Sequence, residues 1–451
     1  MSYALLVFIP FGVSTCAYLA RRARTLAAWM SIGAIALEVL LAVGLSDRGQ
    51  LLGIAVDVHP VARLILVATL TLMAATFFYA WLMGRDSSFF ASGLATAGAI
   101  TASILTMSEP FVASAFVMLS ALFAAFGLLP QYGSKKHAMA AARYISSMVM
   151  AGICLLTAFM VVGEFLVARE PLLARVATAA VVMGLAILLA AFPFHFWLPR
   201  VIEQAPIVAS ALLIGPIGML GVGFFIATVD GFPSMLADER TRTLAMLVGT
   251  QAALGGAVLA YSQRRLTHLL AYSLASAAGA TIVGLASGSI LGIGGAVLSS
   301  LGNALSATLA LMCLGLASED GSAPADDRLM GLKSRQPFTL IALLIAGLGL
   351  AGLPPFVVFP GRWMIYEAAA LREPLLALAL IAASAILVLA HARSLHRLMS
   401  SAESAAPSAS HPRGATRLIL SMALLSIVVG LYPAPILELI NAVLSQMPSL
   451  L

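Results

Sequence analysis

The chain is dominated by long apolar stretches joined by short polar connections. About 14 of these stretches reach the roughly 20 residues that a helix needs to cross a bilayer. Inside a bilayer the protein itself must satisfy every backbone N–H and C=O, and a helix does so within one segment. Only 10% of the residues are charged, against about 25% in soluble domains. The sequence therefore predicts an all-α polytopic membrane protein with about 14 transmembrane helices.

The excess of basic residues is explained by membrane topology rather than by nucleic acid. When the N-terminus is placed outside, most of the 25 Lys and Arg residues fall in connections on the inner side. That asymmetry is typical of cytoplasmic loops. We therefore expect a bacterial-type inner-membrane protein, multi-pass, with both termini on the outer side and no nucleic-acid partner. The first helix, 3–20, should be retained, because no basic segment precedes it.

The cysteines do not form a redox or metal motif. Cys16, Cys154 and Cys313 are far apart in apolar stretches, which favours inert packing thiols. The sequence contains no motif for a nucleotide, flavin, quinone or iron–sulfur cluster. We therefore expect no cofactor, no metal and no catalysis by the chain alone. Whether it is a subunit of a proton-translocating oxidoreductase stays open at this point.

Two of the apolar stretches are too long for one straight crossing, and both contain proline in the middle. Stretch 173–200 contains Pro193, and stretch 338–371 contains Pro354 and Pro355. Proline removes a backbone donor and clashes with the preceding turn, so a helix breaks there. Discontinuous helices of this kind line ion and substrate sites in membrane transporters.

The positions of the two breaks predict an internal repeat. Each broken span is the fourth in a block of five spans, 89–228 and 243–392. An odd number of spans makes the second block enter the membrane from the opposite side. We therefore expect two inverted five-helix repeats. N-terminal transmembrane helices in 1–88 precede them, and a cytoplasmic loop with a last transmembrane helix in 393–451 follows.

Three motifs, in order, resemble those of a known family. They are PFHFWLP at 193–199 with AP at 205–206 and SALL at 210–213, LLAYS at 269–273, and GLPP at 352–355 with Phe359 beyond it. The family comprises the antiporter-like membrane subunits of respiratory complex I, of hydrogenase-4 and formate hydrogenlyase complexes, and of multisubunit cation/proton antiporters. The resemblance implies a broken-helix scaffold formed by Pro193, Trp197, Pro199, Pro354 and Pro355.

The resemblance also implies a function. Family members move protons or Na⁺ through each five-helix half, by a buried acid and by lysines on the broken helix and its neighbours. Most of these ionisable positions are replaced here. Leu188 and Leu220 stand where two family lysines fall, and segment 111–129, where the acid belongs, contains no charged residue. Asn303 and Ala307 replace a histidine and a lysine on a later helix.

Three candidates for an ion path lie near the first break and the LLAYS motif. Histidine titrates near neutral pH and can relay a proton, but His195 can also bond the backbone freed by the break, which we favour. Glu203 either pairs with Arg200 or caps the next helix, and we favour the pair. His268 lies close to a helix end, where an interfacial role is favoured.

Two further candidates follow the second break. Arg362 stays charged, because guanidinium does not deprotonate in proteins. It is either a fixed charge that organises water or an acid such as Glu367, or an interfacial arginine.

Glu38 is unusual inside a span, and we interpret it as a subunit contact. A basic end that reaches lipid headgroups is predicted at His391, Arg393, His396 and Arg397.

The replaced positions favour a degenerate module of a complex I- or hydrogenase-4-like respiratory complex, with a structural or weakened proton-translocating role. One alternative is an active proton- or cation-translocating module. Another is the membrane subunit of an inorganic-carbon or ion transporter that works with a soluble partner. The expected partners are the lipid bilayer and other membrane subunits, with protons or Na⁺ as the ions.

Overall fold

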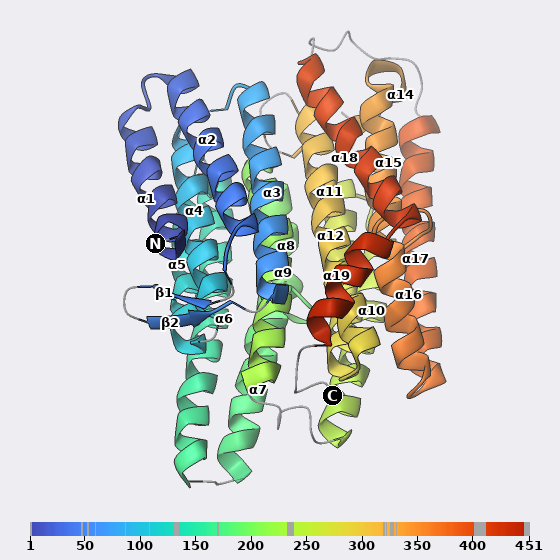
Figure 1. The fold of residues 1–451 in the computed structure, drawn as a ribbon. Coiled ribbons are helices and arrows are strands. Elements are labelled where there is room, and N and C mark those ends of the chain that lie inside the picture. The colour runs from blue at the N-terminus through green and yellow to red at the C-terminus, as the bar shows by residue number, and fades with distance from the viewer. Residues whose placement is uncertain are drawn as a thin grey trace. The chain divides into compact units, whose positions relative to one another are not determined.

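The computed structural model is almost entirely helical, as predicted (Figure 1). Eleven helices in the described part are long and apolar enough to cross a membrane. Three shorter apolar helices fall within further predicted spans. The polytopic membrane fold is therefore confirmed. The structure describes the whole chain except residues 1, 47, 52–53, 59, 86, 108, 130–134, 169–170, 232–238, 319–320, 322, 325–328, 331, 401–411 and 446–451.

The chain divides into two units, and unit 1 consists of residues 1–189 and 216–238. Within it α1 packs against α2 and α4, α2 packs against α3 and α4, and α5 lies between α4 and α6. Its elements are α1 (Ser2–Leu19), α2 (Arg24–Val43), β1 (Arg48–Leu51), β2 (Ile54–Asp57), α3 (Pro60–Leu82), α4 (Ser87–Leu105), α5 (Pro110–Leu128), α6 (Lys135–Ala168), α7 (Pro171–Leu188) and most of α9 (Ile207–Gly231).

Unit 2 consists of residues 190–215 and 239–451. Its centre is α12, which packs against α11, α15, α16 and α18. Besides the 3₁₀ turn Phe194–Phe196 and the start of α9, its elements are α8 (Trp197–Gln204), α10 (Glu239–Ser262), α11 (Leu266–Ala286), α12 (Ile290–Leu316), α14 (Leu332–Arg335), α15 (Pro337–Leu350), α16 (Val358–Ala370), α17 (Pro374–Ser400), α18 (Arg413–Leu431) and α19 (Ala434–Leu444).

Both predicted helix breaks are present. Helix α7 ends at Leu188, and α8 begins only at Trp197, after Pro193. Helix α15 ends at Leu350, and α16 begins at Val358, after Pro354 and Pro355. The prolines therefore act as predicted, since their rings cannot continue the hydrogen-bond ladder of the preceding helix.

Glycines on α12 allow α16 to approach its backbone closely. A Cβ at Gly302 would lie 3.0 Å from Val358, and one at Gly295 would lie 2.8 Å from the carbonyl oxygen of Gly361. A larger side chain at either position would push α16 away, because packed interiors leave little free volume. This close contact fixes the position of the helix that carries Arg362.

Some features differ from the sequence-based expectation. The loop after α2 contains a short antiparallel hairpin in which Arg48 pairs with Asp57. Helix α6 begins at Lys135, so its basic residues lie on the helix rather than in a loop. The amphipathic helix α19 follows α18 and packs against α12. The predicted cytoplasmic loop after α17 lies mostly outside the described residues.

The two units relate only loosely to the predicted repeats. Residues 190–215, inside the predicted first repeat of 89–228, belong to unit 2 by their contacts, because α8 packs on α11. Helices α10 to α17, which cover the predicted second repeat of 243–392, all belong to unit 2. The inverted relationship of the repeats stays a prediction.

Candidate functional site

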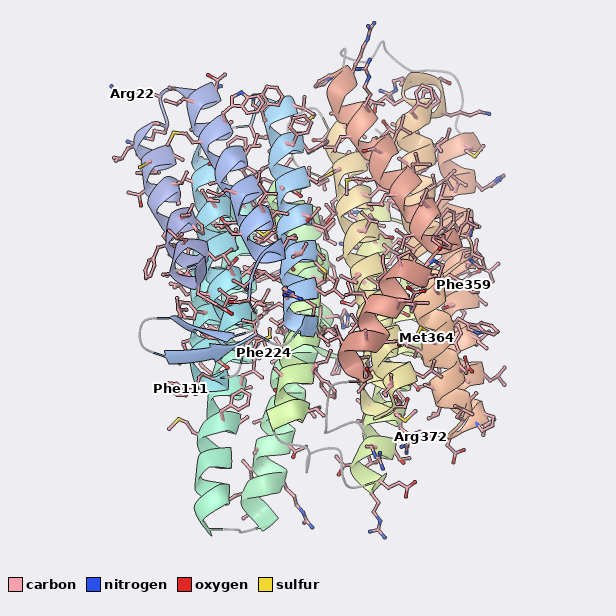
Figure 2. All side chains as sticks on the ribbon, in the orientation of Figure 1. Arg22, Phe111, Phe224, Phe359, Met364 and Arg372 are labelled. Carbon is pink, nitrogen blue, oxygen red and sulfur yellow. The ribbon has the colours of Figure 1, made fainter. Side chains whose placement is uncertain are left out.

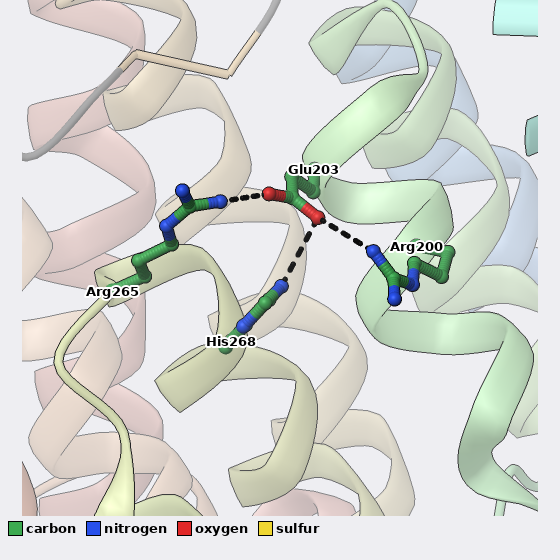
Figure 3. Close-up of polar contacts among 4 residues, drawn as sticks. All are labelled: Arg200, Glu203, Arg265 and His268. Carbon is green, nitrogen blue, oxygen red and sulfur yellow. Dashed lines mark hydrogen bonds and ion pairs between the residues drawn. The ribbon is translucent and has the colours of Figure 1, made fainter. Parts of the chain in front are cut away.

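The first polar cluster of unit 2 surrounds Glu203, near the end of α8 (Figure 3). Its carboxylate forms an ion pair with Arg265, and its Oε2 lies 3.2 Å from Nε2 of His268 and 3.6 Å from Nη1 of Arg200. Arg265 and His268 belong to the start of α11, where the helix dipole favours an anion. Sequence reasoning identified the pair with Arg200 but not the two partners on α11.

The Glu203 cluster lies at the surface of unit 2. The side chains of Arg265 and Arg200 are 63% and 49% exposed, while those of His268 and Glu203 are 22% and 20% exposed. Exposed ion pairs contribute only about 0.2–1 kcal/mol each. The cluster therefore joins α8 to α11 but contributes little to the free energy of unfolding. It places two arginines and a histidine around one carboxylate.

His195 lies between aromatic rings at the first break. Its ring stacks on Phe192 with centroids 5.3 Å apart, and it tilts against Tyr272 of the LLAYS motif at 5.2 Å. The ring is half-buried. The aromatic contacts hold its orientation and connect the break to α11. The role that we favoured for this histidine, a bond to the backbone freed by the break, stays a prediction.

The broken-helix scaffold is only partly enclosed. Trp197 and Pro199 are buried in α8, whereas Pro193 and Pro354 are exposed. The carbonyl group of Pro355 lies against Gly430 on α18, where a Cβ would overlap its oxygen. Helix α18 therefore covers the backbone at the second break, as non-helical backbone at membrane depth requires.

Arg362 is the most deeply buried charge in the described part of unit 2, at 1% exposed. It lies on α16, which Figure 2 marks with the labelled side chains of Phe359 and Met364. One guanidinium nitrogen donates to Ser384 Oγ at 3.3 Å, and the other donates to the Leu350 carbonyl at 3.5 Å. The hydroxyl of Tyr366 lies 2.6 Å from the same Ser384 oxygen.

The broken helix itself stabilises this buried charge. Leu350 is the last residue of α15, and carbonyls in the last turn of a helix lack intrahelical donors and carry the negative end of the helix dipole. A cation at that end is favourable. Gly352 has φ of 78°, and a Cβ there would lie 3.2 Å from Arg362 Cγ. Glycine suits this position for two reasons: it adopts the left-handed conformation without strain, and it leaves room for the arginine side chain.

Glu367 does not form an ion pair with Arg362 in the structure. It lies five residues further along α16 and is exposed, whereas Arg362 is buried. No ion pair to Arg362 is present among the described residues, and its Nε there has no hydrogen-bond partner. The interpretation of Arg362 as an interfacial arginine is wrong, and the idea that it organises Glu367 is not supported by these positions.

His391 is a buried polar residue that sequence reasoning assigned wrongly. It was placed in a basic end that reaches the lipid headgroups, but it is 7% exposed and faces α11. Its Nε2 lies 3.0 Å from Ser273 Oγ, in the LLAYS motif. A cavity of about 20 Å³ beside His391 and Ser394 is large enough for roughly one water molecule.

The spacing of apolar residues along α17 could have shown that His391 is buried. Leu380, Leu387 and Ser394 are buried at seven-residue intervals, and so are His391 and Leu398 one turn away. Residues spaced by seven return to the same face of a helix. Arg393 lies off this stripe and donates to the carbonyl groups of Tyr261 and Gln263 at the end of α10.

The replaced family positions of unit 1 are apolar and closed. Leu188 and Leu220 are each 1% exposed. A Cβ at Gly221 would lie 2.8 Å from Leu189 and 3.5 Å from Leu188, so the end of α7 packs tightly on α9. In unit 2, Asn303 is buried on α12 and its amide nitrogen lies 3.5 Å from Ser299 Oγ.

The sequence resembles those of known membrane subunits. Residues 166–388 match a family model described as NADH:quinone oxidoreductase/Mrp antiporter, TM. The chain is 28% identical to NADH-quinone oxidoreductase subunit N of Desulforudis audaxviator, over 80% of the chain and 79% of that protein. It is 29% identical to NADH-quinone oxidoreductase subunit N 2 of Solidesulfovibrio magneticus, over 56% of the chain and only 53% of that relative.

A solved structure has the same fold. A chain of respiratory complex I from Thermus thermophilus with bound NADH superimposes with a TM-score of 0.83, covering 100% of this chain and 99% of that one. The two sequences are 19% identical. At that identity the likeness establishes the arrangement of helices alone.

The contact of Gly347 with His391 generates a prediction. A Cβ at Gly347 would lie 2.7 Å from His391 Nδ1, so Gly347→Ala should destabilise the protein by about 1–3 kcal/mol through overpacking. Adding His391→Ser should recover most of that loss, because the smaller side chain removes the clash. Thermal unfolding of the purified chain in detergent measures both, as a double-mutant cycle.

Gly218→Ala is the matched control, since nothing lies within 4 Å of the added Cβ. It should leave the unfolding midpoint unchanged or raise it slightly, because alanine favours a helix over glycine. Equal losses for Gly347→Ala with and without His391→Ser would show that the two positions do not interact.

Proposed function

We propose that the chain belongs to the antiporter-like membrane subunits of NADH:quinone oxidoreductases and Mrp antiporters, which the family match over residues 166–388 and the likeness to subunit N support, and that it is one membrane subunit of a respiratory complex. In that complex it is a degenerate module, with a structural or weakened role in proton translocation. It performs no redox chemistry by itself. Its partners are the bilayer and neighbouring membrane subunits, because the proteins that it resembles are subunits of NADH-quinone oxidoreductase and of a respiratory complex.

The packing of Leu188 and Leu220 is the observation that carries this proposal. A proton path needs titratable side chains or ordered water at each step, and a charge in the membrane must be paired or hydrated. Both leucines are buried, and α7 meets α9 tightly at Gly221. The two positions that would hold lysines in a conducting member, Leu188 and Leu220, are therefore dry and apolar.

An active module remains the second candidate, and the polar groups of unit 2 favour it. Arg362 is buried at the end of α15, and His391 contacts Ser273 beside a cavity large enough for about one water. These groups could hold water in the second unit. Since the guanidinium group of arginine does not deprotonate in proteins, Arg362 would act there as a fixed positive charge.

Proton flux in proteoliposomes separates the two candidates. For a degenerate module, the purified full chain should add little flux above protein-free vesicles, and Arg362→Ala should leave that flux unchanged. For an active module, wild-type flux should fall about tenfold or more in Arg362→Ala, a change of about 1.4 kcal/mol in the barrier. Arg362→Lys, which keeps the positive charge, should then retain most of the flux.

Arg372→Ala is the control for general effects of losing an arginine, because Arg372 lies beyond the end of α16 and outside the polar clusters. A wild-type flux that depends on Arg362 and not on Arg372 would overturn the degenerate role.

Assembly is tested separately from transport. An affinity tag on the full chain, with mild solubilisation of native membranes, should recover further membrane subunits together with it. An unrelated tagged membrane protein from the same cells is the control. Recovery of this chain alone would contradict its role as a subunit of a complex.

We further propose that both termini face the outer side of the membrane, which the distribution of basic residues supports. With the native cysteines replaced by serine, Ser2→Cys should react with an impermeant maleimide in whole cells. Arg22→Cys, in the turn between α1 and α2, should react only after permeabilisation. The opposite pattern would reverse the orientation.

A further inference from the structure

Glu38 is a fully buried carboxyl group in the middle of α2. It is 0% exposed, and it lies on the packed stripe of that helix together with Ser31, Ile35 and Ala42. The sequence suggested a contact with another subunit at this position. Burial within unit 1 excludes that interpretation, because the side chain cannot reach the surface.

The Thr101 hydroxyl of α4 lies next to the Glu38 carboxyl. Neither group completes hydrogen-bond geometry with any described residue. On α4, Thr96 donates to the Ser92 carbonyl and Thr106 to the Ala102 carbonyl, whereas the Thr101 hydroxyl, like that of Thr69 on α3, makes no such bond. The hydroxyl of Thr101 is left for the carboxyl.

The surroundings of Glu38 contain no compensating cation within the described residues. Helix α4 carries no charged side chain. On α3, Arg63 donates to the Leu45 carbonyl at 2.9 Å, seven residues beyond Glu38 and so about 10 Å along the helix. Arg24 begins α2, four turns away. The other titratable groups on the helices packed against α2 are Tyr3, Cys16, Tyr18 and Tyr79.

A carboxylate in such a place would be a buried, unpaired charge, which proteins avoid by neutralising the group. The neutral acid instead has one O–H to donate and a carbonyl oxygen to accept, and a single hydroxyl can satisfy either. The geometry thus suits a carboxylic acid beside Thr101 better than a carboxylate or a metal ion.

We propose that Glu38 is a proton-binding site of unit 1, with Thr101 as the hydrogen-bond partner of its protonated carboxyl. The contribution of this site to transport rests on the function proposed above, whereas the presence of a bound proton does not.

Labelling with dicyclohexylcarbodiimide tests the proposal on the full chain in membranes. The reagent adds to protonated carboxyl groups in apolar surroundings. At neutral pH, mass spectrometry should find more than about tenfold more label on Glu38 than on Glu109, because the reagent favours carboxyl groups in apolar surroundings. Glu109 is exposed at the start of α5, which makes it the internal control.

Infrared difference spectra on deuteration give a second readout that does not need a reagent to enter. The stretching band of a protonated carboxyl should be present in the wild type, absent in Glu38→Gln, shifted in Thr101→Val and unchanged in Glu109→Gln. The Thr101→Val variant keeps the size of the side chain, so it tests the partner even where Glu38→Gln folds poorly.

An unlabelled Glu38 together with no carboxyl band would overturn the proposal. Protection of Glu38 from the reagent by Na⁺ would also overturn it, in favour of a cation site. A large proton flux through the wild-type chain would overturn the degenerate role without changing the labelling result, so the two failures can be told apart.

Discussion

The buried guanidinium of Arg362 links the broken end of α15 to α16 and α17 in unit 2. Arginine cannot lose its charge, so the protein must supply acceptors for it. The Leu350 carbonyl and the Ser384 hydroxyl do so, and the dipole of α15 adds to their effect. The Leu350 carbonyl accepts this bond because of the break, since a continuous helix would use that carbonyl for its own hydrogen bonds. Gly352 and the glycines of α12 then allow the backbone approach that brings Arg362 to this position.

The two units differ in how they handle polar groups. Unit 2 contains the Glu203 cluster, the contact between His391 and Ser273, and Arg362. Unit 1 has leucine at the expected lysine positions, and its buried acid is on α2 rather than α5. A dry interface such as that of Leu188 stabilises helix packing, since no charge has to be desolvated. The broken-helix scaffold is thus present, while the positions where the resemblance implies lysines are apolar.

Sequence reasoning succeeded where one residue has one strong local effect. Proline interrupts a helix wherever it stands in the interior, so both breaks were predicted close to their observed ends. The pair of Glu203 with Arg200 followed from a spacing of three on a helix. The partners Arg265 and His268 could not be predicted, because they come from another helix, 62 and 65 residues further along the chain.

Hydropathy and proline placement determined by themselves that this chain is a polytopic helical membrane protein with two broken helices, because both signals act within a single segment. Only the tertiary structure decided which polar side chains are enclosed. Glu367 is exposed and His391 is buried, although both lie on helices of similar composition. The side of a helix that faces its neighbours depends on how helices distant in sequence pack together, and a loose apolar pattern in a membrane leaves that rotation undetermined.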